Sequence, residues 1–214
     1  MGSEPVTSDP AGLHPPGRRD AVRNYHRVLN AAREVLGESG ADASMEEIAA
    51  RAGVGVGTVY RRFANKDALI DELVRLSMAE ALEEARQALG CPGGDGLERF
   101  LRGLGALFAD HAKYAHLLLE RSGDSADTRE IRAAIQELTG RALAAATLNP
   151  GVTVGDVMSL VWGMRGLTET TDEVAPGTWQ RFLDIHLAGL RTPGPLSATP
   201  SMSPGQLAEL LPRP

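Results

Sequence analysis

The stretch SMEEIAARAGVGVGTVYRRFANKDALIDEL, from Ser44 to Leu73, contains the pattern that decides the fold. Ser44 can accept a hydrogen bond from the amide of Glu47, and the Glu47 side chain can accept one from the amide of Ser44, so the two residues predict a capping box at the start of a helix. Gly53 can adopt the left-handed conformation that ends a helix. We therefore expect a helix of about two turns, a short turn, and a second short helix over about residues 56–63.

Two short helices joined by a glycine-containing turn are typical of a helix-turn-helix, whose second helix enters the DNA major groove by its N-terminal end. Gly55 and Gly57 leave no side-chain bulk at that end, and the amides of a first helical turn favour anionic oxygens. The polar side chains next to it are Thr58, Tyr60, Arg61, Arg62 and Lys66. The alternative, a nucleotide phosphate loop, is excluded because the pattern G-x-x-x-x-G-K-[ST] is absent.

This stretch resembles the DNA-binding domain of the TetR family of bacterial transcriptional regulators. The family pattern is a Ser or Thr cap, Ile-Ala-x-x-Ala-Gly-Val, Gly-Thr-x-Tyr-x-x-Phe, and Lys-x-x-Leu. The matching residues are Ser44, Ile48, Ala49, Ala52, Gly53, Val54, Gly57, Thr58, Tyr60, Phe63, Lys66 and Leu69. The resemblance covers about residues 18–72, a quarter of the chain, and the remainder is similar to the family only in its helical architecture.

The resemblance implies a role for each matching position. Phosphate contacts are expected from Ser44, Thr58, Tyr60 and Lys66, and base-edge contacts from Val56, Gly57 and Arg61. Arg18 and Arg19 either reach the minor groove as a flexible arm or remain solvated, and Arg62 is a phosphate-side or solvated charge rather than a base reader. The chain departs from the family at Gly55, where Ser or Thr is common, so this position offers a backbone contact and no hydroxyl.

Charge is distributed unevenly along a chain whose net charge is −6. From Arg18 to Lys66 there are nine Lys and Arg against six Asp and Glu, whereas residues 67–214 have thirteen against twenty. The asymmetry indicates that one small part of the chain meets an anion. Cys91 is the single cysteine, which excludes an internal disulfide framework and favours a reduced, cytoplasmic setting. The N-terminal residues lack the apolar region of a secretory signal, and we expect no membrane span.

Apolar periodicity predicts an all-α protein of about nine helices, because apolar residues recur at three- to four-residue intervals and never alternate. We expect a disordered arm over residues 1–17 and a helix-turn-helix domain over 18–66. A larger helical domain for ligand binding and dimerisation would span 67–191, followed by a mostly disordered, proline-rich tail over 192–214.

The resemblance implies that the last two long helices, about 153–171 and 176–191, pack against those of a second chain in a homodimer. Their apolar surface is wider than one face, which agrees with burial against a partner; the alternative is that it completes the core of one chain. The interface candidates are Val157, Val161, Met164, Trp179, Leu183, His186 and Leu190.

The ligand is expected to bind among polar or aromatic side chains that lie on otherwise apolar faces. These candidates are His111, His116, Glu120, Trp162 and Arg165. We expect no metal site and no cofactor, and the sequence has neither GxSxG nor HExxH.

The predicted function is a ligand-responsive regulator that binds double-stranded DNA as a homodimer. We expect a repressor of a palindromic operator, from which an unknown small molecule releases it. One alternative is an activator or a ligand-independent regulator of the same fold. The other is a helical enzyme or carrier in which the helix-turn-helix is only structural.

Overall fold

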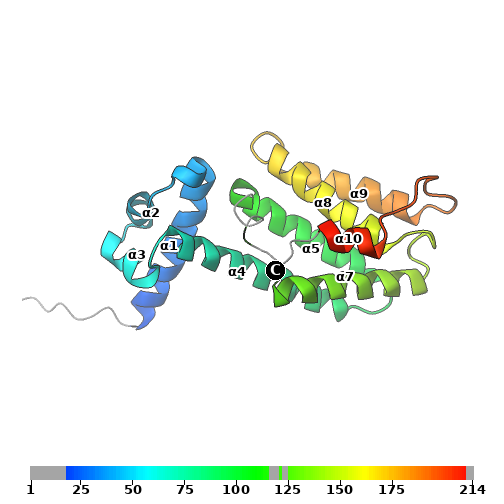
Figure 1. The fold of residues 1–214 in the computed structure, drawn as a ribbon, viewed down its shortest axis with the longest axis horizontal. Helices are drawn as coiled ribbons and strands as arrows, with labels where there is room; N and C mark the ends of the chain where they lie inside the picture. Colours follow the sequence, from blue (N-terminus) through cyan, green and yellow to red (C-terminus); the bar gives the residue numbers. More distant parts are fainter. Residues whose placement is uncertain (1–17, 116–120, 122–124, 211–214) are drawn as a thin grey trace, which may run out of the picture.

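The computed structural model describes residues 18–115, 121 and 125–210. Within these residues it contains nine α-helices, two short 3-10 helices and no strand, which confirms the predicted all-α class. The predicted arm over residues 1–17 lies outside the described residues. Figure 1 shows a small group of helices, α1 to α3, joined by the long α4 to a larger bundle of α5, α7, α8, α9 and α10.

The N-terminal domain is built on α1 (Arg18–Ser39), a 22-residue helix. The 3-10 helix η1 (Gly40–Asp42) leads to α2 (Met45–Ala52), and a short turn leads to α3 (Val56–Arg62). One face of each helix is buried in a shared core, which includes Val28, Ala32, Leu36, Ile48, Val59 and Phe63. Val54 is half-buried and packs against this core.

The long helix α4 (Lys66–Leu89) belongs to both domains. Its first half, through Leu69, Leu73 and Val74, is buried in the N-terminal core, and its second half, from Ala81, is buried in the larger core. The hydrophobic core of the first domain therefore continues about two turns past the boundary expected at residue 66.

The larger domain surrounds one apolar core. Its helices are α5 (Asp95–His111), α7 (Ala126–Ala144), α8 (Val154–Thr171) and α9 (Thr178–Arg191), with the 3-10 helix η2 (Ala112–Tyr114) after α5. α5 is central, since it contacts α4, α7, α8 and α9. Tyr114 of η2 is the exception to this division, because it is buried in the N-terminal core and thereby joins the two domains.

The segment after α9 differs from the disordered tail that its prolines predict. The Asn149 side chain donates to the carbonyls of Thr192 and Gly194, both at 2.7 Å, and the hydroxyl of Thr153 lies 2.9 Å from that of Ser201. The segment ends in α10 (Pro204–Leu210), where Leu207 packs on the larger core. Residues 192–210 are thus held by contacts distant in sequence, which a composition argument cannot detect; residues 211–214 lie outside the described residues.

None of the helices in the described ranges is both long and apolar enough to span a membrane.

Candidate nucleic-acid interface and internal cavity

The start and end of α2 have the local geometry expected from the sequence. The Ser44 hydroxyl accepts a hydrogen bond from the Glu47 amide at 3.2 Å, and the Glu47 carboxylate accepts one from the Ser44 amide at 2.9 Å. These bonds to Ser44 hold the pKa of the Glu47 carboxyl below its usual range. Gly53 ends α2 at φ 61° and ψ 41°, and a Cβ there would lie 2.6 Å from the Arg27 guanidinium. The left-handed backbone conformation of Gly53 therefore fixes the turn before α3.

α3 presents one face to solvent that includes the three predicted base-contacting residues. Val59 is completely buried on the opposite face, whereas Val56 is 40% exposed and Tyr60 is 45% exposed. Gly57 and Arg61 are exposed as well, and a Cβ at Gly57 would meet nothing within 4 Å. Because 56, 57, 60 and 61 fall on one side of a helix, we call these four residues the α3 outer face.

Thr58 and Tyr60, both predicted to contact phosphate, make polar contacts within the chain. The Thr58 hydroxyl accepts from Arg61 at 3.3 Å, and the Tyr60 hydroxyl lies 3.5 Å from a Glu46 carboxylate oxygen. Lys66, half-buried, is the first residue of α4. The side chains of Arg18 and Arg19 lie outside the described residues, although α1 begins at Arg18.

Arg62 does not share the α3 outer face. Its guanidinium lies 5.0 Å from the centre of the Tyr25 ring on α1, a cation–π distance. The Tyr25 ring also stacks on Phe63 at 6.2 Å. Arg62 therefore packs beside the junction of α1 and α3.

Sequence reasoning missed a polar cluster that ties α1 to α4 behind α3. Tyr25 donates a hydrogen bond to the Glu72 carboxylate, and Arg75 donates to both Glu72 oxygens at 2.7 and 2.9 Å. The hydrogen bonds from Arg75, and to a lesser extent the one from Tyr25, lower the pKa of Glu72 to about 2. Burial and the neighbouring Glu72 carboxylate raise the pKa of Tyr25. Glu72 and Arg75 have the spacing of a helical ion pair, but Tyr25 is 47 residues away, so no local pattern could reveal the cluster.

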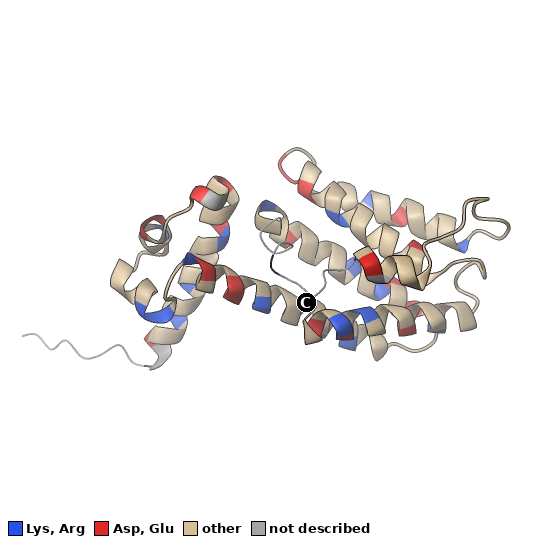
Figure 2. Cartoon of the chain, viewed as in Figure 1, with Lys and Arg blue, Asp and Glu red and all other residues tan. Residues whose placement is uncertain are grey.

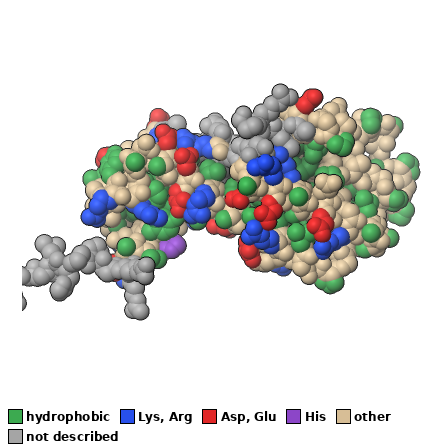
Figure 3. All heavy atoms as spheres, turned by 60° about the horizontal axis from the view of Figure 1, so that its bottom comes forward, with side chains coloured by type: hydrophobic (Ala, Val, Ile, Leu, Met, Phe, Trp, Pro, Cys, Tyr) green, Lys and Arg blue, Asp and Glu red, His purple; other side chains and the backbone are tan. Residues whose placement is uncertain are grey.

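The charge pattern sets α3 apart from the larger domain. α3 carries Arg61 and Arg62 and no acidic residue, as Figure 2 shows in blue without red. Figure 3, which views one face, shows basic side chains at the outer end of the N-terminal domain and mixed acidic and basic side chains toward the junction of the domains. A local positive surface on a chain of net charge −6 suits contact with a polyanion.

The larger domain contains a cavity of about 570 Å³ between α4, α5, α7 and α8. Of the predicted ligand-contacting residues, His111, Trp162 and Arg165 line it. His116 and Glu120 lie outside the described residues. The described ranges contain no group of three or more His, Cys, Asp or Glu placed to hold a metal ion.

His111 connects the cavity wall to α1. Its Nε2 lies 3.2 Å from a Glu80 carboxylate oxygen, and the other Glu80 oxygen lies 3.7 Å from the Arg33 guanidinium. Burial lowers the pKa of His111, against the opposing effect of Glu80, so the ring is neutral near neutral pH. The His111 ring lies 5.4 Å from that of Tyr114, whose burial raises its pKa to about 12. Residues 111–114 therefore run from the cavity into the core of the N-terminal domain.

Five of the predicted interface residues are inside the core of one chain, so their assignment to a partner surface is wrong. Each is at most 7% exposed, and together they are Val157, Val161, Met164, Trp179 and Leu183. Their wide apolar surface is covered because α8 is packed by α5, α7 and α9 of the same chain. Val161 also lines the cavity. His186 is exposed and Leu190 is half-buried, so these two remain candidates.

The outward surface of α8 and α9 is smooth and partly apolar. We call it the α8–α9 face; its residues are Ser159, Gly163, Gly166, Thr170, Phe182, Ile185 and His186. Ile185 is 57% exposed. The His186 ring lies 3.9 Å from the Phe182 ring, and its Nδ1 lies 2.8 Å from the Phe182 carbonyl oxygen.

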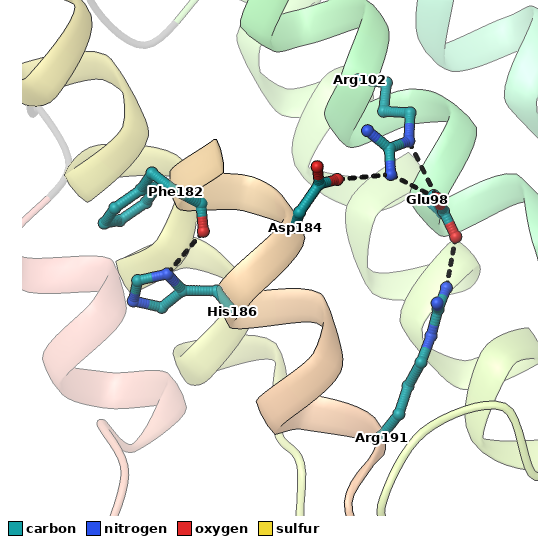
Figure 4. A network of polar contacts seen from close by, with 6 residues as sticks. All are labelled: Glu98, Arg102, Phe182, Asp184, His186 and Arg191. Carbon is teal, nitrogen blue, oxygen red and sulfur yellow. Dashed lines mark hydrogen bonds and ion pairs between the residues drawn. The ribbon is translucent and has the colours of Figure 1, made fainter. Parts of the chain in front are cut away.

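The opposite side of α9 is fixed to α5 by ion pairs. Arg102 of α5 bonds Asp184 at 2.8 Å, and Arg191 bonds Glu98. Figure 4 shows Asp184 and Arg191 of α9 pointing toward Arg102 and Glu98 of α5, whereas Phe182 and His186 point away from α5. One side of α9 is thus paired with α5 of the same chain, and the other side has none of these ion pairs.

Comparison with known proteins places these features in a family. Residues 28–73 match the family described as "Bacterial regulatory proteins, tetR family". The HTH-type transcriptional regulator UidR of Escherichia coli is 38% identical over 64 residues, 29% of this chain and 33% of that protein. YvdT of Bacillus subtilis, described as an uncharacterized HTH-type transcriptional regulator, is 36% identical over 66 residues, 30% of this chain and 34% of that protein. These matches span about a third of the length of the curated relatives.

Solved structures extend the similarity to both domains. A TetR transcriptional regulator from Streptomyces coelicolor superposes with a TM-score of 0.58 and 28% identity, covering 78% of this chain and 97% of that one. A TetR transcription regulatory protein from Mycobacterium vanbaalenii gives a TM-score of 0.57 and 28% identity, covering 83% of this chain and all of that one. With the helix-turn-helix geometry and the matched residues, these similarities show a DNA-binding domain of the TetR type over residues 28–73 and, over both domains, the fold of TetR transcriptional regulators.

Proposed function

We propose that this protein is a homodimeric transcriptional repressor that binds a palindromic operator and is released from it by a small molecule. The observation that carries the proposal is the α3 outer face, on which Val56, Gly57 and Arg61 are exposed together beside a positive surface. An exposed helix of this kind is what a helix-turn-helix inserts into the major groove. The matching transcriptional regulators of Escherichia coli and Streptomyces coelicolor support a DNA-binding regulatory role.

A second copy of the chain binds at the α8–α9 face. The exposed Ile185 and the half-buried Phe182 supply apolar area on this face. Gly163 is already close to Phe182, because a Cβ there would lie 3.1 Å from the ring. A two-fold dimer formed in this way carries two copies of α3 and reads an inverted repeat.

Release depends on the path from the cavity to the N-terminal core. A ligand in the cavity contacts His111, and η2 carries Tyr114 into the core that supports α2 and α3. A ligand that prefers one arrangement of this segment changes the position of α3 relative to its twin, and so changes operator affinity.

Selection of duplex DNA from a random pool tests the DNA-binding part of the proposal. The full-length chain should enrich an inverted repeat whose half-site centres are about 10 base pairs, or a multiple of that distance, apart. Arg61→Ala should enrich a less defined half-site at the same spacing. Enrichment of isolated half-sites would contradict the palindrome, and absence of any enrichment would contradict DNA recognition.

The sign of regulation is tested with a reporter placed behind the selected operator. Expression should fall when the protein is present. A rise would identify an activator of the same fold, which is the principal alternative.

A further inference from the structure

The cavity in the larger domain has a chemical character that restricts its ligand. Its volume of about 570 Å³ lies within the range of small-molecule sites, about 300–1,000 Å³. Most of the wall is apolar, with Leu104, Leu107, Phe108, Ile131, Met158 and Trp162 among its residues. A molecule that fills it must therefore bury mainly apolar surface.

The cationic groups on or behind this wall already have partners. Arg165 donates to Glu169 at 2.7 Å and to the Ala115 carbonyl at 3.2 Å. Arg33, behind the wall, faces Glu80. Arg132 also has a partner, although its buried Nη2 makes no hydrogen bond. An ionised ligand would lose its hydration on entry to a mostly apolar cavity, where Arg165 already pairs with Glu169, so its burial would be costly.

His111 supplies a polar group with a defined preference. Since the Glu80 carboxylate can only accept hydrogen bonds, the proton of the neutral ring belongs on Nε2, which lies 3.2 Å from it. Nδ1 of that tautomer is an acceptor. A hydroxyl or N–H group of a ligand can donate to it, whereas an ether or a carboxylate cannot.

The geometry points to an effector that is uncharged and mostly apolar and that carries a hydrogen-bond donor, such as a hydroxyl group, for His111. This inference rests on the proposed function for the idea that a ligand of the cavity controls DNA binding. The chemical class itself follows from the cavity wall, so binding can be measured without DNA.

Isothermal titration calorimetry of the full-length protein at pH 7.5 tests the class with four probes that share a ten-carbon chain: 1-decanol, decyl methyl ether, decanoate and decylammonium. The alcohol should bind at least about tenfold more tightly than either ion, because the ions must be desolvated. It should bind about fivefold more tightly than the ether, which cannot donate to His111. Tightest binding of decanoate or decylammonium, or binding of none of the four, would overturn the inference.

Variants locate the bound probe. Leu107→Trp should abolish 1-decanol binding by filling the cavity, whereas Ala106→Trp, on the exposed side of the same turn of α5, should leave it unchanged. His111→Phe should bring the alcohol and the ether to equal affinity. If both tryptophan variants lost 1-decanol binding to the same extent, binding in this cavity would be contradicted. If 1-decanol binds as expected and operator affinity stays constant, the ligand class stands and the proposed release mechanism fails.

Discussion

Replacement of Gly57 by leucine should separate folding from DNA binding. A Cβ at Gly57 meets nothing within 4 Å, so leucine should cause no clash within the chain. Glycine costs a helix interior about 0.5–1 kcal/mol relative to a good helix former. Gly57 lies in the first turn of α3, so we expect its replacement by leucine to gain stability near the lower end of that range. The variant should therefore be as stable as the native chain or slightly more stable.

The same leucine side chain should obstruct DNA. It would stand on the α3 outer face, where the backbone must approach the duplex closely. Loss of one good base contact costs about 1–3 kcal/mol, and a dimer loses it in both half-sites, so operator affinity should fall roughly thirtyfold or more.

Fluorescence anisotropy with the selected operator and urea denaturation measure the two effects. Gly140→Leu is the matched control, because Gly140 is exposed on α7, its Cβ position is also open, and it is distant from α3. The control should keep operator affinity. If Gly57→Leu binds the operator as tightly as the native chain, residue 57 does not face DNA and the assignment of the α3 outer face is wrong.

Three further predictions concern base reading, dimerisation and pH. In competition binding, Arg61→Ala should relax the preference for particular bases. Lys66→Ala should weaken binding to all DNA sequences alike and reduce by about 1 the slope of log affinity against log salt concentration. Equal effects of the two variants on specificity would refute this division. Ile185→Arg should give monomers in sedimentation equilibrium, and Val22→Arg, at a similarly exposed apolar residue of α1, should remain dimeric; a dimeric Ile185→Arg would place the interface elsewhere. Glu72→Gln should lower the free energy of unfolding at pH 7. Because folding depresses the Glu72 pKa from 4.5 to about 2, this difference should shrink as the pH falls through that window, and a constant difference would exclude the charge as its cause.

The helix-turn-helix could be predicted because its determinants are local. The bonds between Ser44 and Glu47 span three residues, and Gly53 needs only its own backbone conformation to end α2. A short stretch of sequence contains all of this information. His111 and Trp162 line the cavity. The sequence could single them out because each is a polar or aromatic residue on an otherwise apolar helix face.

The outward face of α8 and α9 could not be predicted because periodicity identifies an apolar stripe without identifying what covers it. Met164 and Leu183 are apolar and periodic, yet they are completely buried within one chain. The residues left outside include Gly163, Gly166 and Ile185, which do not form a conventional stripe. The contacts of Asn149 with the segment after α9, like the bond between Tyr25 and Glu72, join residues more than forty positions apart.

The salt dependence of DNA binding tests the central claim most directly. Affinity of the full-length protein for the selected duplex should be measured by anisotropy at several salt concentrations between about 50 and 200 mM. The logarithm of the association constant should fall linearly and steeply with the logarithm of salt concentration, because phosphate contacts release counterions. Binding that is independent of salt, or absent for every duplex, would contradict a DNA-binding role for α3 and favour a helical protein in which the helix-turn-helix is only structural.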